Sequence, residues 1–400
     1  MRDRIPAPGR ENRIRITQDD GTIIAGKLEY DDQATQEGSP YTKGNVLPDE
    51  VCTAYDLDTN IAEPKDAFLA VPGIMGKALL TITVTRITGA AYPNVTVNGL
   101  TGIDAARRKT NSNGQVVVYV DAGTYNLTFT PSPVCVDTSI PSKSITVAAG
   151  GIANITTQEV SNGLTSLDIT STRTIAFSAN IQNLDAFLVG GGGAGGGRAE
   201  NGQACCGGGG GYTLTRKNIS ISRYTAYSLI IGAGATGGTN NGGTGGSTSA
   251  FGASVSGGTG GKQLARNTTE KLGGDGGSGG GSSFFQNDGA VWRPQKGGED
   301  GSDGKGTNPG SGQGTTTRAF GESSGALFAG GGGCGAASAT ILNNGGSGGG
   351  GGGGWAMHEN GYDGTANTGG GGGGAGDAQG AIAGGSGGSG IIKLRWVNVS

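Results

Sequence analysis

The distribution of glycine constrains the fold of this chain more than any other feature of its sequence. The 400 residues include 88 glycines, whereas an average globular protein holds about 7% glycine. Only 15 of the 88 lie in residues 1–189, which leaves 73 for residues 190–400. Each ordered residue costs roughly 1–2 kcal/mol of backbone entropy, and glycine has no side chain whose burial could offset that cost. The second half is therefore either disordered or ordered by contacts between backbones.

Three kinds of structure compete for residues 190–400: collagen, a disordered linker, and a packed array of extended helices with three residues per turn. Collagen needs glycine at every third position and much proline, but the register breaks repeatedly and the region holds only Pro294 and Pro309. An extended threefold helix makes no internal hydrogen bonds, so its N–H and C=O groups can all bond to neighbouring helices. Glycine allows the close approach that such bonds require.

Strand-like segments around the glycine runs favour the ordered array over the linker. Residues 174–189 end in an apolar phrase that leads directly into Gly190, and residues 391–397 again alternate apolar and polar positions. Between the first two glycine runs, residues 212–231 read as two alternating strands. A flexible linker would not need to return to a strand after so long a stretch. The sequence therefore predicts a β-sandwich-like unit over residues 161–400, with a glycine-rich insertion at about residues 190–390.

The phrases that flank the glycine runs also carry a resemblance. They are LDAFLVGGGGAGGG at residues 184–197, YSLIIGAGATGG at residues 227–238 and GGSGGSGIIKLRW at residues 384–396. These phrases resemble the glycine-rich domain common in phage tail proteins. They are also similar to glycine-rich modules of some receptor ectodomains, in which polyglycine helices emerge from a jelly roll. The resemblance implies a mainly β fold, a jelly-roll-like domain with an inserted polyglycine II helix bundle.

Residues 77–160 read as a small β-sandwich. Alternating segments predict strands at residues 79–87, 94–97, 116–120, 124–129, 144–148 and 152–157. The phrase NSNG at residues 111–114 is a turn signal, with a glycine able to adopt positive φ. The order of these segments resembles the carboxypeptidase-regulatory or prealbumin-like β-sandwich, which implies a structural spacer. An independent carbohydrate site is the alternative.

Residues 1–76 mix charged and short apolar phrases. Strands are expected at residues 13–16 and 22–28, across a turn at Asp20–Gly21. Residues 31–58 resemble a short N-terminal segment of tail-fibre-like phage proteins, which implies a virion-attachment domain that docks to tail or baseplate proteins. The alternative is a small independent domain without a docking role.

The sequence offers little for catalysis, cofactors or metals, and it predicts a protein that is not an enzyme. His358 is the single histidine, and no nucleophile phrase accompanies it. Three cysteines without histidine partners are a poor zinc set. Cys205 or Cys206 could bridge to Cys334, or all three could fill gaps as small buried residues. The net charge of -3 argues against binding nucleic acid by phosphate neutralisation.

Recognition must use the segments that interrupt the glycine runs, since glycine has no side chain with which to discriminate a ligand. These segments are residues 264–272, 282–296, 315–328 and 355–362, and we expect them to be turns at the tip of the bundle. Loops on a rigid scaffold commonly carry binding, and Trp, Tyr and Arg dominate binding hot spots. The alternative is that their aromatic residues only cover the flanks of the bundle. The candidate receptor-binding residues are Phe284, Phe285, Trp292, Arg293, Phe320, Trp355, His358 and Tyr362.

These expectations combine into one functional hypothesis, a phage tail-fibre or receptor-binding protein of the virion. Its N-terminus would dock to the tail or baseplate, and its glycine-rich domain would bind a carbohydrate or protein receptor on the host without covalent chemistry. We expect a homo-oligomer, with a trimer favoured. We expect neither binding to nucleic acid nor insertion into a membrane. No secretory signal pattern is visible, which is consistent with synthesis in the host cytoplasm. The alternatives are a decoration protein of capsid or tail and a bacterial surface adhesin.

Overall fold

The computed structural model divides the chain into two compact units, Met1–Gly76 and Lys77–Ser400. Most of the second unit is described, but little of the first. The described residues are 13–17, 19–27, 49, 52, 76–199, 204–263, 271–282, 284–286, 291–293, 295–336, 344–354, 359–376 and 380–397. Trp355 and His358, and most of the predicted attachment domain, therefore lie outside the described residues.

Most of the described residues of the first unit form an antiparallel hairpin. It pairs β1 (Arg13–Thr17) with β2 (Ile23–Lys27), which agrees with the strands predicted there. In the turn between them, the Thr22 amide donates to the Asp20 carboxylate at 2.8 Å. Hydrogen bonds from Thr22 lower the pKa of Asp20. This is the local side-chain-to-backbone bond that favours aspartate in turns.

Two three-stranded sheets form the first core of Lys77–Ser400. Their strands are β3 (Ala78–Thr85), β4 (Thr96–Asn98), β5 (Gln115–Val120), β6 (Gly123–Thr130), β8 (Lys143–Val147) and β9 (Ile152–Gln158). The sheet orders are β5-β3-β9 and β4-β6-β8, and every strand lies within two residues of a predicted one. Side chains of β3 are alternately buried and partly exposed along its whole length, as expected for a strand with one face toward a core. Leu80 and Ile82 are fully buried there.

The connections of this sandwich include a turn that only glycine fits. Gly114, in the predicted NSNG turn, has φ +71°, and a Cβ on it would lie 2.4 Å from the carbonyl oxygen of Val84. The remaining elements between Asn98 and Ser166 are the 3-10 helix η1 (Ala105–Arg108) and the short paired strands β7 (Thr138–Ser139) and β10 (Val160–Ser161).

A buried polar cluster joins this sandwich to the part of the chain that follows it. The guanidinium carbon of Arg86 lies 3.5 Å from the ring centroid of Tyr224. The Tyr224 hydroxyl donates to Glu159 at 3.1 Å, and the Thr138 hydroxyl donates to the same carboxylate at 2.6 Å. Glu159 is 2% exposed, so these bonds supply the partners that a buried carboxylate needs. Burial raises the pKa of Tyr224 to about 12, and the nearby Glu159 acts in the same direction.

A four-stranded antiparallel sheet carries the second core, in the order β11-β20-β13-β14. The strands of this region are β11 (Ser166–Ile169), β12 (Arg173–Ile175), β13 (Ile181–Val189), β14 (Thr213–Ile221), β15 (Tyr227–Leu229), β16 (Thr248–Ala250), β17 (Ala253–Val255) and β20 (Ile391–Arg395). The core includes Phe177, Leu184 and Leu188, which precede the glycine runs, and Ile392 and Trp396, which follow them. The chain thus returns to the same sheet after the glycine runs, and the predicted mainly β fold is confirmed. The jelly-roll connection stays a prediction.

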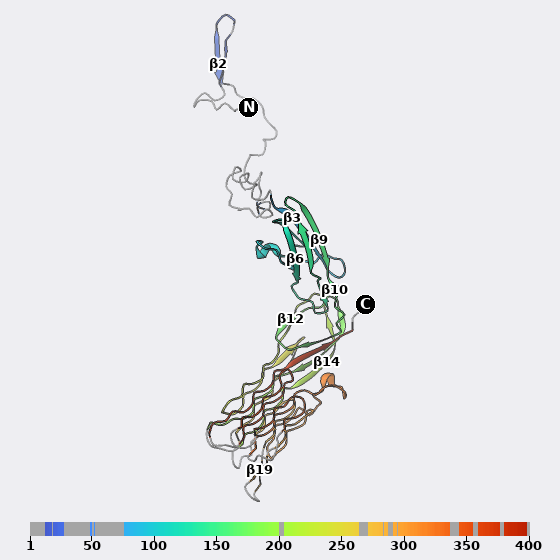
Figure 1. Ribbon diagram of the computed structural model, residues 1–400, viewed down its shortest axis with the longest axis vertical. Coiled ribbons are helices and arrows are strands. Elements are labelled where there is room, and N and C mark those ends of the chain that lie inside the picture. Colours follow the sequence, from blue (N-terminus) through green and yellow to red (C-terminus); the bar gives the residue numbers. More distant parts are fainter. Residues whose placement is uncertain are drawn as a thin grey trace. The chain divides into compact units, whose positions relative to one another are not determined.

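The glycine runs between β13 and β20 form a packed array beside this sheet, in which extended segments lie side by side (Figure 1). We call this region the glycine array. Its described segments are residues 190–198, 204–212, 232–246, 256–263, 271–282, 295–314, 329–336, 344–354, 359–376 and 380–390.

Hydrogen bonds in the array repeat every third residue. The amides of segment 190–198 donate in rotation to residues 206–212, 240–246 and 382–388, at 2.7–3.0 Å. The donor and acceptor pairs are Gly190–Tyr212, Gly193–Gly209 and Gly196–Cys206; Gly191–Gly246, Ala194–Gly243 and Gly197–Asn240; and Gly192–Gly388, Gly195–Gly385 and Arg198–Ile382. Backbone groups that lack partners within their own segment therefore find them in three neighbours. The assignment of these segments as polyglycine II helices stays a prediction.

The spacing between neighbouring segments excludes side chains at most interior positions. A Cβ on Gly195 would lie 1.9 Å from the carbonyl oxygen of Gly373, and one on Gly373 would lie 1.8 Å from that of Gly352. Both distances are far below any van der Waals contact. Glycine is thus required here by the closeness of the backbones rather than by unusual φ angles.

Small residues occupy the few interior positions that have room. Cys205 packs with Ala375 and Ile382, and Cys206 packs with Leu272 and Cys334. All five cysteines of the chain are buried thiols, and no disulfide joins them. The Cys334 thiol donates to the carbonyl oxygen of Cys205 at 3.2 Å. Of the two alternatives for these cysteines, the structure has the small buried fillers.

Candidate binding surface of the glycine array

Three of the four segments that interrupt the glycine runs leave the array at the end remote from the sheet. The array begins at Gly190, next to β13, and Arg198 and Cys205 lie at its other end. The described flanks of the interruptions bond to residues near that end. The relevant donor and acceptor pairs are Cys206–Lys262, Lys262–Leu272, Cys334–Gln295, Gly335–Cys205 and Gly376–Glu359. The interruptions at residues 264–272, 282–296 and 355–362 therefore start from one end of the array.

The second interruption contains a short β-hairpin that brings four candidate residues together. It pairs β18 (Phe284–Gln286) with β19 (Val291–Arg293). The register places Phe284 opposite Arg293 and Phe285 opposite Trp292. Three aromatic residues and one arginine thus lie within a single two-stranded ribbon.

Phe320 lies at the other end of the array, against the sheet. It belongs to the short 3-10 helix η2 (Ala319–Gly321), and its ring centroid is 6.1 Å from that of Phe187 on β13. The guanidinium carbon of Arg395 lies 4.2 Å from the Phe320 ring centroid. The Phe328 ring also packs on Phe187, with 5.4 Å between the two ring centroids. The interruption at residues 315–328 is therefore not at the remote end with the other three, which corrects the expectation that all four form turns at the tip. Receptor contact by Phe320 stays a prediction, and the contacts it makes here are packing contacts.

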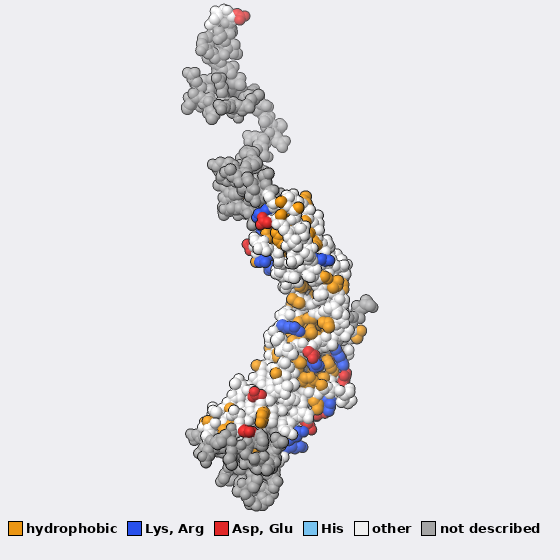
Figure 2. Space-filling view, in the orientation of Figure 1, with side chains coloured by type: hydrophobic (Ala, Val, Ile, Leu, Met, Phe, Trp, Pro, Cys, Tyr) orange, Lys and Arg blue, Asp and Glu red, His pale blue; other side chains and the backbone are white. Residues whose placement is uncertain are grey.

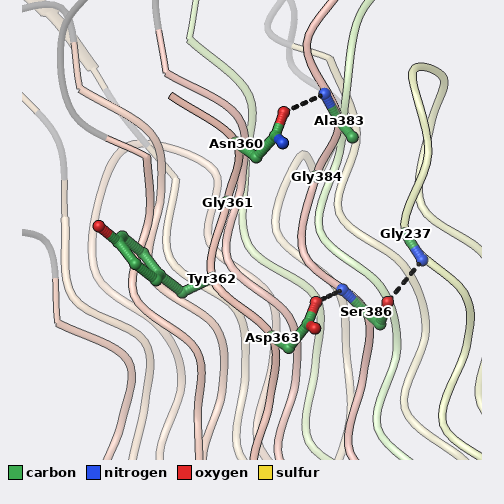
Figure 3. Close-up of a pocket in the computed structure, with 8 residues that line it drawn as sticks. All are labelled: Gly237, Asn360, Gly361, Tyr362, Asp363, Ala383, Gly384 and Ser386. Carbon is green, nitrogen blue, oxygen red and sulfur yellow. Dashed lines mark hydrogen bonds between the residues drawn. The ribbon is translucent and has the colours of Figure 1, made fainter. Parts of the chain in front are cut away.

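Tyr362 lines a shallow groove of about 370 Å³ on the side of the array. The groove also includes Asn360, Asp363, Ser386 and Gly237, and Tyr362 is 53% exposed. Figure 3 shows that the tyrosine ring points away from the three polar side chains, which turn toward the neighbouring backbone. Tyr362 and its polar neighbours thus present separate faces.

The polar side chains of the groove bond to backbone amides. Asn360 Oδ1 accepts from the Ala383 amide at 3.0 Å, and Asp363 Oδ1 accepts from the Ser386 amide at 2.6 Å. Ser386 Oγ accepts from the Gly237 amide at 3.1 Å. None of these polar residues was predicted from the sequence as a site residue. Asn360 and Asp363 each precede a glycine, and this Asx-Gly dipeptide is the signal that could have marked them.

The carboxylates of residues 299–303 stabilise turns of the array. Glu299 Oε2 accepts from the Ser347 amide at 3.2 Å and from Lys296 Nζ at 3.0 Å. The bonds from Ser347 and Lys296, in that order, lower the pKa of Glu299 to about 2. Asp300 accepts from the Thr316 hydroxyl at 2.6 Å and from Arg318 Nε at 3.1 Å, and its pKa is lowered as well. Within the described residues, no group of three or more His, Cys, Asp or Glu side chains could hold a metal ion.

The surface of Lys77–Ser400 carries charges of both signs. On the face in Figure 2, Lys and Arg side chains lie among Asp and Glu side chains over the described residues. Among the described residues, no helix has the length and apolar character that a bilayer crossing requires.

Comparison with known proteins bears on the glycine-rich part of the chain. A family model described as Glycine-rich domain matches residues 165–397, which begin just before β11 and end just after β20. No curated protein matches the sequence. The matched residues cover more than half of the chain and include both the four-stranded sheet and the whole array. The chain therefore belongs to the Glycine-rich domain family.

Proposed function

We propose that this chain is a phage tail-fibre or receptor-binding protein that contacts the host surface through the remote end of its glycine array. In this proposal, residues 1–76 dock to the tail or baseplate, residues 77–160 act as a spacer, and the array carries the residues that bind the host receptor. The protein resides in the virion, acts without catalysis, and forms a homo-oligomer, with a trimer favoured.

The observation that carries this proposal is the distribution of side chains in the array. Segments held together by backbone hydrogen bonds form a scaffold whose interior has no room for side chains. Three interruptions that can carry larger side chains start from its remote end, and one of them holds the β18–β19 hairpin. A scaffold of this kind holds binding loops in place at low entropic cost.

We further propose that the array segments are polyglycine II helices. The three-residue repeat of the hydrogen bonds of residues 190–198, whose amides all donate to other segments, is the property of an extended threefold helix. Such helices form a stiff bundle only when each one is clamped at its ends. Strands β13 and β20 supply that clamp at one end, because both lead directly into the array.

The test is binding of the fluorescently labelled full chain to susceptible and resistant host cells. We expect binding to susceptible cells, and loss of at least tenfold in affinity for Phe285→Ala/Trp292→Ala, since truncated aromatic hot spots cost about 2 kcal/mol or more. The proposal places receptor contact at the remote end, so the remaining candidate at the sheet end, Phe320, serves as the comparison. Phe320→Ala should bind like the parent chain if it remains folded.

Other outcomes would point to other functions. Binding along the capsid or tail shell, with none to any host cell, would replace receptor binding with decoration. Release of sugar or peptide fragments from host envelopes would show an enzyme. Loss of binding in the Phe320 variant alone would move the receptor site to the sheet end of the array.

A further inference from the structure

In the last segment of the array, one row of amides bonds to side-chain oxygens and not to backbone carbonyl oxygens. Amides of residues 382–390 donate in a three-residue rotation, as those of segment 190–198 do. Gly384, Gly387 and Gly390 donate to the backbone of residues 232–238, and Gly385 and Gly388 donate to Gly373 and Gly370. The third row of amides has no backbone acceptor of this kind. Instead, Ala383 donates to Asn360 Oδ1 and Ser386 donates to Asp363 Oδ1.

The third row therefore uses side-chain oxygens in place of backbone carbonyl oxygens. The two donors are three residues apart, and so are the two acceptors, so the repeat of the array continues through the side chains. In segment 190–198 the equivalent third row reaches backbone carbonyls, for example from Gly195 to Gly385. The groove lined by Gly237, Asn360, Asp363 and Ser386 thus lies at a lateral edge of the array.

Among the described residues, the same bonding unit occurs three times with the same local sequence. In each case the Asx side chain accepts from the amide of a distant residue, and the glycine that follows donates to the carbonyl oxygen of that same residue. We call this unit the Asx-Gly clamp. The three clamps are Asn360–Gly361 on Ala383, Asp363–Gly364 on Ser386 and Asp275–Gly276 on Ser311.

We propose that the Asx-Gly clamps prevent a glycine-rich segment of a second copy of this chain from pairing with the edges of the array. An open row of backbone amides is a template for pairing with another chain. The array of a second copy is the occupant that fits, because its segments present carbonyl oxygens at every third residue and lack side chains that would prevent close approach. Asn360 and Asp363 saturate the amides of Ala383 and Ser386, so the edge offers such a segment no donors.

The experiment compares the full chain with Asn360→Ala/Asp363→Ala, which removes both acceptors and retains both Cβ atoms. The matched control is Thr365→Ala, at an exposed position of the same segment. Asn360→Asp/Asp363→Asn keeps an acceptor oxygen at each position and should behave as the parent chain. Molar mass by light scattering over a range of concentrations reports association, and residue-resolved hydrogen exchange reports the amides of Ala383 and Ser386.

We expect the molar mass of the clamp variant to exceed that of the parent chain, and we expect this excess to grow with protein concentration. At low concentration its Ala383 and Ser386 amides should exchange about tenfold faster, the equivalent of one lost hydrogen bond. Unchanged exchange at these amides would overturn the clamp, and faster exchange without added mass would overturn its role in closing the edge. If the double variant does not fold, Asp275→Ala, which opens the clamp on Ser311 alone, gives the same two measurements with the same two outcomes.

Discussion

The sandwich of β3–β9 and the glycine array are ordered by opposite means. In the sandwich, Leu80, Ile82 and other apolar side chains are fully buried, and the hydrophobic effect offsets the entropy of ordering the backbone. In the array, interior positions such as Gly195 have no space for a Cβ, and lateral backbone bonds hold the segments together. The comparison teaches that a chain can exchange side-chain burial for backbone bonding, provided that nearly every interior residue is glycine.

The largest expected effect is that of a single methyl group inside the array. Gly373→Ala would place a Cβ 1.8 Å from the carbonyl oxygen of Gly352, so the segments must separate and lose their bonds. We expect destabilisation by more than about 4 kcal/mol, measured by denaturant unfolding. Gly238→Ala is the control, because no atom lies within 4 Å of its added Cβ, and it should change stability by less than about 1 kcal/mol. Equal effects at the two positions would refute close packing of the array.

A core truncation in the sandwich should have the next largest effect. Leu80→Ala removes a fully buried side chain and should cost about 2–5 kcal/mol. Val117→Ala, at a position that is 45% exposed, should cost less than about 0.5 kcal/mol. Hydrogen exchange sharpens the comparison, since Leu80→Ala should speed exchange in β3 and leave the array protected at low denaturant. Faster exchange in the array to the same degree would show that the two regions unfold together.

The polar cluster between the two regions should contribute less. Tyr224→Phe removes the hydrogen bond to Glu159 and keeps the ring beneath Arg86, so we expect a loss of about 1 kcal/mol. The pKa of Tyr224 is raised to about 12 from an ordinary value of 10.0. Its stabilising contribution is therefore complete below pH 10 and is lost as the pH rises toward 12. The difference in unfolding free energy between parent and variant should narrow over that interval, and a constant difference would contradict this assignment.

The smallest effect is expected at the exposed turn of Glu299. Its pKa is lowered to about 2 from an ordinary value of 4.5, so its contribution is present above pH 4.5 and is lost as the pH falls toward 2. The side chain is 44% exposed, and solvent and salt weaken such interactions. Glu299→Gln should therefore cost less than about 1 kcal/mol at neutral pH, and high salt should reduce the cost. A loss of several kcal/mol in the free energy of unfolding, measured by thermal unfolding, would show that the stability of the whole array depends on this turn.

The sequence predicted the strands well because their pattern is local. Alternation in residues 79–87 and 116–120 reflects one face of a strand against a core, and the structure has β3 and β5 there. Residues 174–189 were expected to contribute one strand region and hold two strands, β12 and β13, in different sheets. Pairing across sheets depends on distant residues, so local alternation did not reveal that division.

Long-range features of the array were less accessible. Asp363 bonds to Ser386, and Asp275 bonds to Ser311. These pairs depend on the register between segments, which a run of glycines does not specify. Phe320 illustrates the same limit, since an aromatic residue between glycine runs gives no sign of which end of the array it occupies. It packs on Phe187 at the sheet end, whereas the β18–β19 hairpin leaves from the remote end.

Residue-resolved hydrogen exchange of the intact chain tests most directly whether backbone bonds order the array. The account predicts that the amides of residues 191–197, which all donate to neighbouring segments, exchange as slowly as those of Leu80–Val84 in β3. Exchange of residues 191–197 at the rate of an unstructured peptide, while β3 remains protected, would contradict it.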